Sequence, residues 1–373
     1  MSAVQISILV RILLIIPFMS VNSPLLAETL EQPIKAIVVS ETAQLMAGNE
    51  KLGKLGMGQV VEYDRLQGAW RFLPKQMGWI HESDLIEQAV AVDHFTKRIE
   101  KRPSPTDYHL RGIAYIAREE WGKALLDLEK AYDLEEDSVS LHFNLGICYR
   151  QLGDFPAALR EFTAIIEAHP DEVPAIMARG SLLMSQEHWQ AAQKDFDQAI
   201  KLNPELADAH NLKGVTLRMQ GHLKQAKQEY SKAIELDEEF AQAYANRAFV
   251  MIDMGQPRDA VKDYERAMEL DPDDSEIQND YAWLLATSWD KKVRAPERAL
   301  ELSRQANAAI DEPDGDFLDT LATALAANEM FEDAVITASD ALKLLSGSAR
   351  AEAVGNRLEL FRKKKSFIES KPE

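Results

Sequence analysis

One 34-residue pattern decides how this chain folds, and a clear copy of it reads VPAIMARGSLLMSQEHWQAAQKDFDQAIKLNPEL at residues 173–206. Within this copy Gly180 stands 12 residues before Ala192, and residues 207–240 have small residues at the same two positions. Small residues let two helices cross closely. The spacing therefore predicts a pair of helices in each copy, with one small residue on each helix.

Five copies of the pattern follow one another over residues 105–274. The small residues recur every 34 positions, at Gly112, Gly146, Gly180 and Gly214 in the first helix and at Ala124, Ala158, Ala192, Ala226 and Ala260 in the second. Large residues follow three positions after the first small site, at Tyr115, Tyr149, Leu183, Leu217 and Met251, and four after the alanine, at Leu128, Phe162, Phe196, Tyr230 and Tyr264. Because three and four are helical spacings, each small and large pair is expected on one buried face.

Proline closes several copies, at Pro170, Pro204 and Pro272, where it stops a helix. Together these positions resemble the tetratricopeptide repeat (TPR) family. The resemblance implies a mainly α protein, a right-handed α-solenoid of about seven repeats over residues 105–345. The repeats expected are 105–138, 139–172, 173–206, 207–240, 241–274, 275–314 and 315–348, and the sixth carries an insertion at 289–294.

Both ends of the array are predicted to be covered by extra helices. Residues 90–104 have the pattern of a second helix without its partner, and such an orphan helix would cap the array. Residues 349–373 are expected to form a C-terminal capping helix followed by a charged tail. We expect that tail to be solvated charge at a frayed end.

Residues 33–88 have a different pattern, with β-branched runs separated by turn glycines, which predicts a small all-β unit. Its last part, Gly68-Ala69-Trp70-Arg71-Phe72 followed by Gly78-Trp79-Ile80-His81, resembles the bacterial Src-homology-3-like barrel. That resemblance implies a second ligand-binding module, for cell-wall material or peptides, with Trp70 and Trp79 on its surface. In the alternative, both tryptophans are core residues of a spacer domain.

The N-terminus indicates export. Residues 1–27 carry Arg11 ahead of a short apolar run, and Ala27 offers a cleavage point, which is typical of a signal peptide. The apolar run is shorter than the roughly 20 residues that a membrane-spanning helix needs. We therefore expect a bacterial protein in the periplasm or elsewhere outside the cytoplasm that does not span the membrane after cleavage, and an uncleaved anchor is the alternative.

Composition and motifs point away from catalysis and nucleic acid. The formal net charge is −19, and such a chain repels phosphate backbones. The single cysteine, Cys148, cannot form an intrachain disulfide and is expected to be a buried, inert thiol. The histidines show neither an HExxH pair nor zinc spacing. We accordingly predict no enzyme activity, no metal and no cofactor.

The resemblance implies a peptide-binding groove on the concave face, lined by the second, fifth, sixth, ninth, twelfth and thirteenth positions of the first helices. The candidate residues there are Phe143, Asn144, Ile147, Arg150, Met177, Ser181, Met184, Asn211, Val215, Arg218, Asn246, Phe249, Asn279 and Trp283. Asparagine amides can donate to and accept from a peptide backbone, arginines can bind carboxylates, and the aromatic and methionine side chains offer apolar pockets. The alternative for any one of them is a packing or solvated role.

The sequence therefore favours an exported, non-catalytic scaffold or adaptor that binds a protein or peptide. A cell-envelope structural protein is the alternative: its barrel would grip wall material, and its repeats would serve as a spacer or a self-assembly surface.

Overall fold

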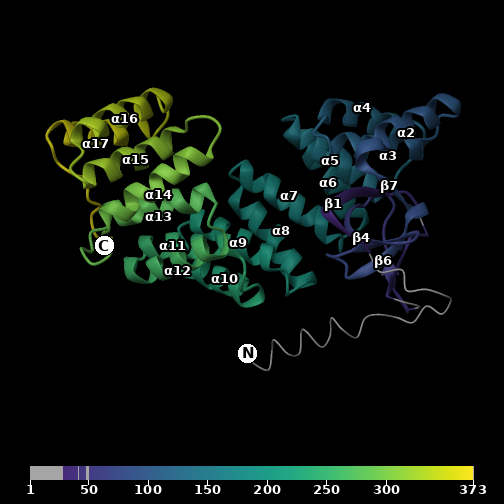
Figure 1. Ribbon diagram of the computed structural model, residues 1–373, viewed down its shortest axis with the longest axis horizontal. Helices are drawn as coiled ribbons and strands as arrows, with labels where there is room; N and C mark the ends of the chain where they lie inside the picture. Colours follow the sequence, from purple (N-terminus) through teal and green to yellow (C-terminus); the bar gives the residue numbers. More distant parts are fainter. Residues whose placement is uncertain (1–27, 41, 48–49, 373) are drawn as a thin grey trace. The chain divides into compact units, whose positions relative to one another are not determined.

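The computed structural model describes residues 28–40, 42–47 and 50–372 (Figure 1). The predicted signal peptide at residues 1–27 lies outside this part. The chain forms two compact units, residues 1–175 and residues 176–373, and each is described by itself.

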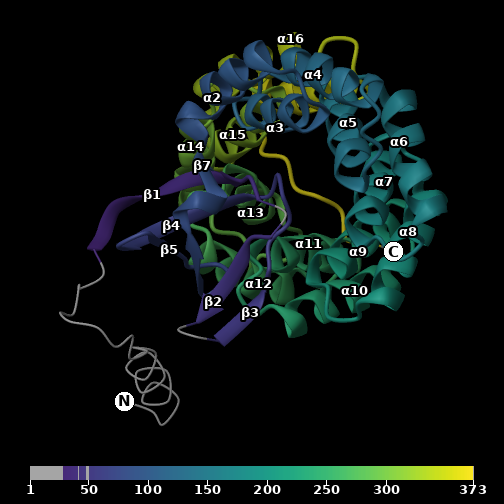
Figure 2. The same cartoon turned by 90° about the vertical axis from the view of Figure 1, so that its right-hand side faces the viewer.

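An antiparallel β-sheet forms the N-terminal part of the first unit. Its strands are β1 (Glu28–Val38), β2 (Gln44–Ala47), β3 (Glu50–Lys54), β4 (Val60–Gln67), β5 (Trp70–Leu73), β6 (Gly78–His81) and β7 (Leu85–Glu87). They lie in the order β3-β2-β6-β5-β4-β1-β7, and β2 and β3 are seen side by side in Figure 2. Buried side chains that include Val61, Tyr63, Leu73 and Ile80 form its core.

The two tryptophans of this region lie on paired strands, because β5 pairs with β6. The Trp70 ring meets His81 edge-on at 5.3 Å, and the Trp79 ring meets Phe72 at 5.1 Å. Both indoles are half-buried. The likeness of this region to a Src-homology-3-like barrel stays a prediction.

Five helices complete the first unit: α2 (Gln88–Lys101), α3 (Pro105–Ile116), α4 (Trp121–Asp133), α5 (Val139–Gln151) and α6 (Phe155–Ala168). Ser104 and Ser138 begin α3 and α5, since each hydroxyl accepts a backbone N–H of the first turn. Phe95 of α2 is fully buried and packs in one cluster with Ile37 of β1 and Ile113 of α3. This helix therefore joins the sheet to the first helix pair.

Helix α7 (Val173–Ser185) crosses the boundary between the units. The second unit continues with α8 (Trp189–Leu202), α9 (Ala207–Met219), α10 (Leu223–Leu236), α11 (Ala241–Asp253), α12 (Pro257–Leu270), α13 (Ser275–Thr287), α14 (Pro296–Ala309), α15 (Gly315–Ala327), α16 (Phe331–Leu344) and α17 (Ala351–Arg362). The expected fold class, mainly helical with an N-terminal antiparallel β region, is confirmed. In the described part of the chain, no helix combines the length and apolar character needed to cross a membrane.

The two helices of a pair approach closely where a glycine faces an aromatic ring. A Cβ atom added at Gly214 would lie 2.6 Å from Cε1 of Tyr230, and one added at Gly146 would lie 2.6 Å from Cε1 of Phe162. Both rings are fully buried. The glycine is therefore required for close packing, since a methyl group would overlap the ring.

The turn between the helices of a pair contains one residue in the left-handed region. This residue is Gly153, Gly221 or Gly255 in repeats two, four and five, with φ of 81°, 79° and 71°, and Glu119 or Glu187 in repeats one and three, with φ of 58° and 59°. Glycine adopts this conformation without the steric penalty that a side chain brings. Repeats one and three therefore carry local backbone strain that repeats two, four and five lack.

Contacts between an arginine or histidine and an acidic side chain join the two helices of the first five repeats in an alternating pattern. In repeats one, three and five, an arginine Nε donates to an aspartate Oδ2 at 2.6, 2.9 and 2.6 Å, in the pairs Arg111–Asp127, Arg179–Asp195 and Arg247–Asp263. In repeats two and four, histidine Nδ1 and glutamate Oε2 lie 2.6 and 2.7 Å apart in the pairs His142–Glu161 and His210–Glu229. The alternation has a period of two repeats.

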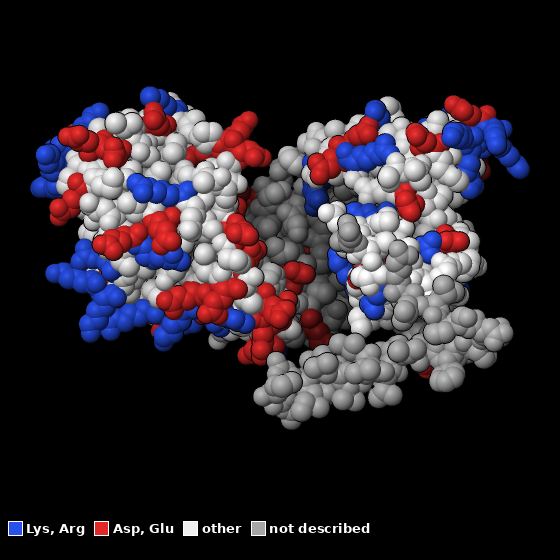
Figure 3. Space-filling model, viewed as in Figure 1, with Lys and Arg blue, Asp and Glu red and all other residues white. Residues whose placement is uncertain are grey.

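Acidic and basic side chains alternate over much of the surface seen in Figure 3. Several form pairs three residues apart on one helix, such as Lys262 with Asp259 and Arg266 with Glu269 on α12. Exposed pairs of this kind contribute little to stability. They show instead that some acidic side chains are locally balanced by basic ones.

Candidate peptide-binding surface

The first helices of the repeats in the second unit, α9, α11, α13 and α15, contact one another in sequence. We call the surface that they share the first-helix face. Seven of the residues singled out from the sequence lie on three of these helices: Asn211, Val215 and Arg218 on α9, Asn246 and Phe249 on α11, and Asn279 and Trp283 on α13. The structure brings four of them into direct contact in pairs.

The first of these pairs is formed by two asparagines. Asn246 donates its amide N–H to Oδ1 of Asn211 at 3.0 Å. Asn211 is only 5% exposed, whereas Asn246 is half-buried. Asn211 therefore positions Asn246, and only Asn246 keeps an accessible surface for a ligand.

The second pair is formed by Arg218 and Phe249. The guanidinium carbon of Arg218 lies 4.5 Å from the centroid of the Phe249 ring, which is a cation–π geometry. Phe249 is 37% exposed, an unusual degree for phenylalanine. The Arg218 Nε atom is buried and has no hydrogen-bond partner within the described part of the chain. Arg218 thus differs from Arg247, which is held by Asp263.

Two carboxyl groups that sequence analysis did not single out lie close enough to Arg218 to feel its charge. Burial raises the pKa of Asp280 to about 6, Glu276 adds to the rise, and Arg218 opposes it. Burial also raises the pKa of Asp253, again opposed by Arg218. They are the sixth and thirteenth positions of their repeats, so the family's position rule covers both.

Two tyrosines also lie close enough to Arg218 to feel its charge. Tyr230 and Tyr264 are fully buried, and the hydroxyl group of Tyr264 has no hydrogen-bond partner among the described residues. Burial raises the pKa of Tyr230 to about 12, and the charge and hydrogen bonding of Arg218 oppose the rise. Tyr264 stacks on Tyr281 with ring centroids 5.4 Å apart. The surroundings of Arg218 therefore combine buried aromatic rings with hydrogen-bond donors and acceptors.

The candidates on α5, in the first unit, have neighbours of their own. The Phe143 ring lies 5.7 Å from the fully buried ring of Phe162, and the Asn144 amide lies 3.2 Å from Nε2 of His109. Both are half-buried, as are Ile147 and Arg150. Phe143 therefore contributes to packing, while Arg150 stands at the same position of repeat two as Arg218 in repeat four.

The remaining candidate residues make fewer specific side-chain contacts. Four of them, on α7 and α9, are half-buried, and the structure assigns them no polar or aromatic contact: Met177, Ser181, Met184 and Val215. Asn279 is 9% exposed, and its Oδ1 atom has no partner among the described residues.

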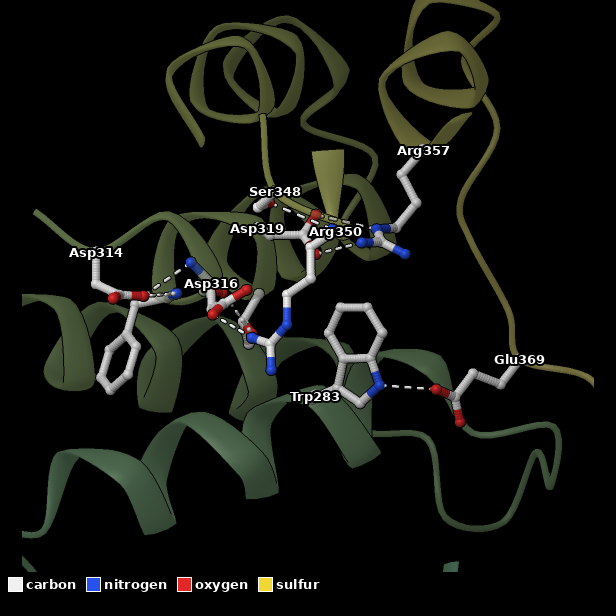
Figure 4. A network of polar contacts seen from close by, with 10 residues as sticks. Trp283, Asp314, Asp316, Asp319, Ser348, Arg350, Arg357 and Glu369 are labelled. Atoms are coloured by element: carbon white, nitrogen blue, oxygen red, sulfur yellow. Dashed lines mark hydrogen bonds and ion pairs between the residues drawn. The ribbon is translucent and has the colours of Figure 1, made fainter. Parts of the chain in front are cut away.

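Trp283 is covered by the chain's own C-terminal segment. Its indole Nε1 donates to Oε1 of Glu369 at 2.8 Å, and the Phe367 ring lies 6.0 Å away (Figure 4). We expected the tail after α17 to be solvated charge. Residues 362–365 are exposed, but residues 366–369 lie on the first-helix face.

Comparison with known proteins agrees with the repeat pattern. Family models described as tetratricopeptide repeat match residues 109–173, 177–248 and 241–274. A tetratricopeptide repeat protein from Parabacteroides merdae has a similar structure, with a TM-score of 0.54 over 73% of this chain and 99% of its own, at 18% sequence identity. This likeness shows the fold.

Two curated relatives from Rattus norvegicus match shorter stretches. Sperm-associated antigen 1 is 30% identical over 81 residues, which are 22% of this chain and 9% of that protein. Serine/threonine-protein phosphatase 5 is 30% identical over 88 residues, which are 23% of this chain and 18% of that protein. The matches thus span less than one fifth of either relative. The helix pairs of residues 109–173, 177–248 and 241–274 are tetratricopeptide repeats, as their resemblance indicated.

Proposed function

We propose that this chain is an exported, non-catalytic scaffold that binds a protein or peptide partner on the first-helix face, with Arg218 at the centre of the contact. Tetratricopeptide repeats generally serve as protein-interaction scaffolds, and the matching family models indicate no enzyme family. The proposal of export rests on the sequence of residues 1–27.

The observation that carries the proposal is the state of Arg218. Arg218 is half-buried and makes no salt bridge within the described residues, and the nearby charges of Asp253 and Asp280 offset its desolvation only in part. It lies against Phe249, a large apolar side chain that is more than one third exposed. An arginine beside an exposed aromatic ring is typical of interface hot spots.

The chemistry around Arg218 suits an extended polypeptide. A peptide backbone presents carbonyl acceptors and N–H donors in alternation. The guanidinium supplies donors for the carbonyls, and the carboxylates of Asp253 and Asp280 supply acceptors for the N–H groups. Asn246 adds an uncharged amide that can both donate and accept hydrogen bonds. A ligand with a carboxylate side chain would gain a charge-assisted bond to Arg218.

A comparison of variants on an array of immobilised peptides tests this surface. We expect Arg218→Ala to weaken binding by about tenfold or more, which corresponds to the loss of a hydrogen bond to a charged group. Asn246→Ala should weaken it less. Arg266→Ala is the matched control, because Arg266 is an arginine paired with Glu269 on the second helix α12, outside the first-helix face.

The far-ultraviolet circular dichroism of all three variants should match that of the unsubstituted chain. Equal array signals for Arg218→Ala and Arg266→Ala would move the binding site away from the first-helix face. The alternative role of the β region in gripping wall material receives less support, since Trp70 and Trp79 pack on His81 and Phe72.

A further inference from the structure

The chain reverses direction after α17. Lys364 adopts the left-handed conformation, with φ of 53°, and the N–H of Lys365 donates to the carbonyl of Leu360 at 3.0 Å. This is the hydrogen bond that closes a Schellman-type helix end. Figure 1 shows the following segment descending from α17 past α15 to the level of α13.

The returning segment binds the carboxyl ends of two first helices. The hydroxyl of Ser366 donates to the carbonyl of Ala326 on α15 at 2.8 Å. The N–H of Glu369 donates to the carbonyl of Thr287 on α13, also at 2.8 Å. The last carbonyls of a helix have no partner within the helix, so they are ready acceptors. These two bonds fix the register of the segment, and the second does not depend on side-chain identity.

Two side chains of the segment are recognised individually. The Phe367 ring lies beside Trp283, and the guanidinium carbon of Arg357 stands 5.3 Å from the Phe367 centroid and 5.1 Å from that of Trp283. The carboxylate of Glu369 accepts the indole N–H of Trp283. Ile368, between them, is 39% exposed. The face therefore selects alternate residues, as an extended ligand requires.

Arg357, which contacts both aromatic rings, is itself held in place by Asp319. Arg357 donates from Nε to Oδ1 of Asp319 at 2.9 Å and from Nη2 to Oδ2 at 2.5 Å, so its guanidinium is fixed in one orientation (Figure 4). The Arg357 and Asp319 side chains are only 12% and 8% exposed. Such a buried, two-pronged pair makes a rigid platform for the aromatic ring.

We propose that this surface is a recognition site for an extended peptide with the pattern Phe-x-Glu, and that the chain's own Phe367 and Glu369 are its resident ligand. This inference deepens the proposed function, since a partner with the same pattern binds here by displacing the tail. Leu358 and Phe361 of α17 are buried in one cluster with residues of α15 and α16, and Phe367 of the tail is only partly buried where it packs against that cluster. A tethered segment acts at an effective concentration of about millimolar, so modest affinity keeps the site filled.

The test uses the full chain and a fluorescein-labelled synthetic peptide with the sequence of residues 363–372, followed by fluorescence anisotropy. In the variant Phe367→Ala/Glu369→Ala the resident segment is released, and we expect the probe to bind at least tenfold more tightly than to the unsubstituted chain. The matched control is Ile368→Ala/Ser370→Ala, which changes two exposed residues of the same segment and should bind the probe as weakly as the unsubstituted chain.

A third substitution in the released variant identifies the site. Trp283→Ala should abolish probe binding, and Trp283→Phe, which keeps a ring but removes the indole donor, should weaken it by about tenfold. Equal probe binding by the released and unsubstituted chains, or unchanged binding after Trp283→Phe, would overturn the proposal. Array binding that depends on Arg218 is a separate readout, so either surface can fail without the other.

Discussion

Replacing Gly214 by alanine tests whether close helix crossing specifies this fold. The added Cβ would lie 2.6 Å from Cε1 and 2.7 Å from Cδ1 of the Tyr230 ring. Real Cβ contacts are longer, so the ring or the helix must shift. Tyr230 is fully buried and packs among Leu217, Ala226 and Val250, which leaves the ring little room to move.

Two opposing contributions set the change in the free energy of unfolding for Gly214→Ala. Overpacking of a well-filled core costs about 1–3 kcal/mol. Alanine in place of glycine inside a helix stabilises by about 1 kcal/mol. Gly355→Ala provides the matched control, because Gly355 lies inside α17 and a Cβ added there meets nothing within 4 Å. The propensity gain is common to both variants, so the free energy of unfolding should differ between them by the steric cost alone.

Urea unfolding followed by circular dichroism at 222 nm measures this difference. Repeat arrays unfold in more than two states, so the midpoints of the transition are compared rather than extrapolated free energies. We expect a lower midpoint for Gly214→Ala than for Gly355→Ala. A midpoint for Gly214→Ala that equals or exceeds that of Gly355→Ala would refute the argument that the glycine is required by the ring.

Three more outcomes are expected. Burial raises the pKa of Cys148 to about 12, so Ellman's reagent should label it slowly in the folded chain and rapidly in urea; fast labelling without urea would contradict its burial. The folded chain holds the Asp280 proton more tightly than the unfolded chain does, since its pKa rises from 3.8 to about 6. The free energy of unfolding therefore falls as pH increases from about 4 to 6, and Asp280→Asn should reduce this fall in urea midpoints measured at pH 4 and 7. Glu187→Gly should raise the midpoint, by up to about 1 kcal/mol in free energy, because Glu187 has the left-handed backbone that Gly221 adopts in the next repeat; an unchanged or lower midpoint would argue against strain there.

The helix pairs were predictable because their signal is local. Small and large residues three or four positions apart meet on one helix face, and a glycine opposite an aromatic ring, as at Gly146 and Phe162, recurs every 34 residues. Such spacing depends only on helix geometry and the length of the turn. Periodicity therefore predicts which residues pack within a repeat.

The side-chain contacts of each candidate binding residue were not predictable in the same way. The repeat pattern places Asn211 and Asn246 on the first helices, but it does not say that one amide donates to the other. The contact between Trp283 and Glu369 joins residues 86 positions apart. The charged residues 362–365 led us to expect a solvated tail, but the residues that contact the first-helix face follow this charged run.

Arg218 stands outside the pairs that join the two helices of its repeat. Position 23 of each of the first five repeats is acidic. In repeats one, three and five that acid is paired with an arginine at position 7, as Asp263 is with Arg247. In repeat four, His210 and Lys213 contact Glu229 instead. The arginine of that repeat is Arg218, at position 12. Repeat two has the same arrangement, with Glu161 held by a histidine at position 4 and an arginine at position 12. In repeats two and four a histidine therefore contacts the acid at position 23, and among the described residues the arginine at position 12 makes no salt bridge.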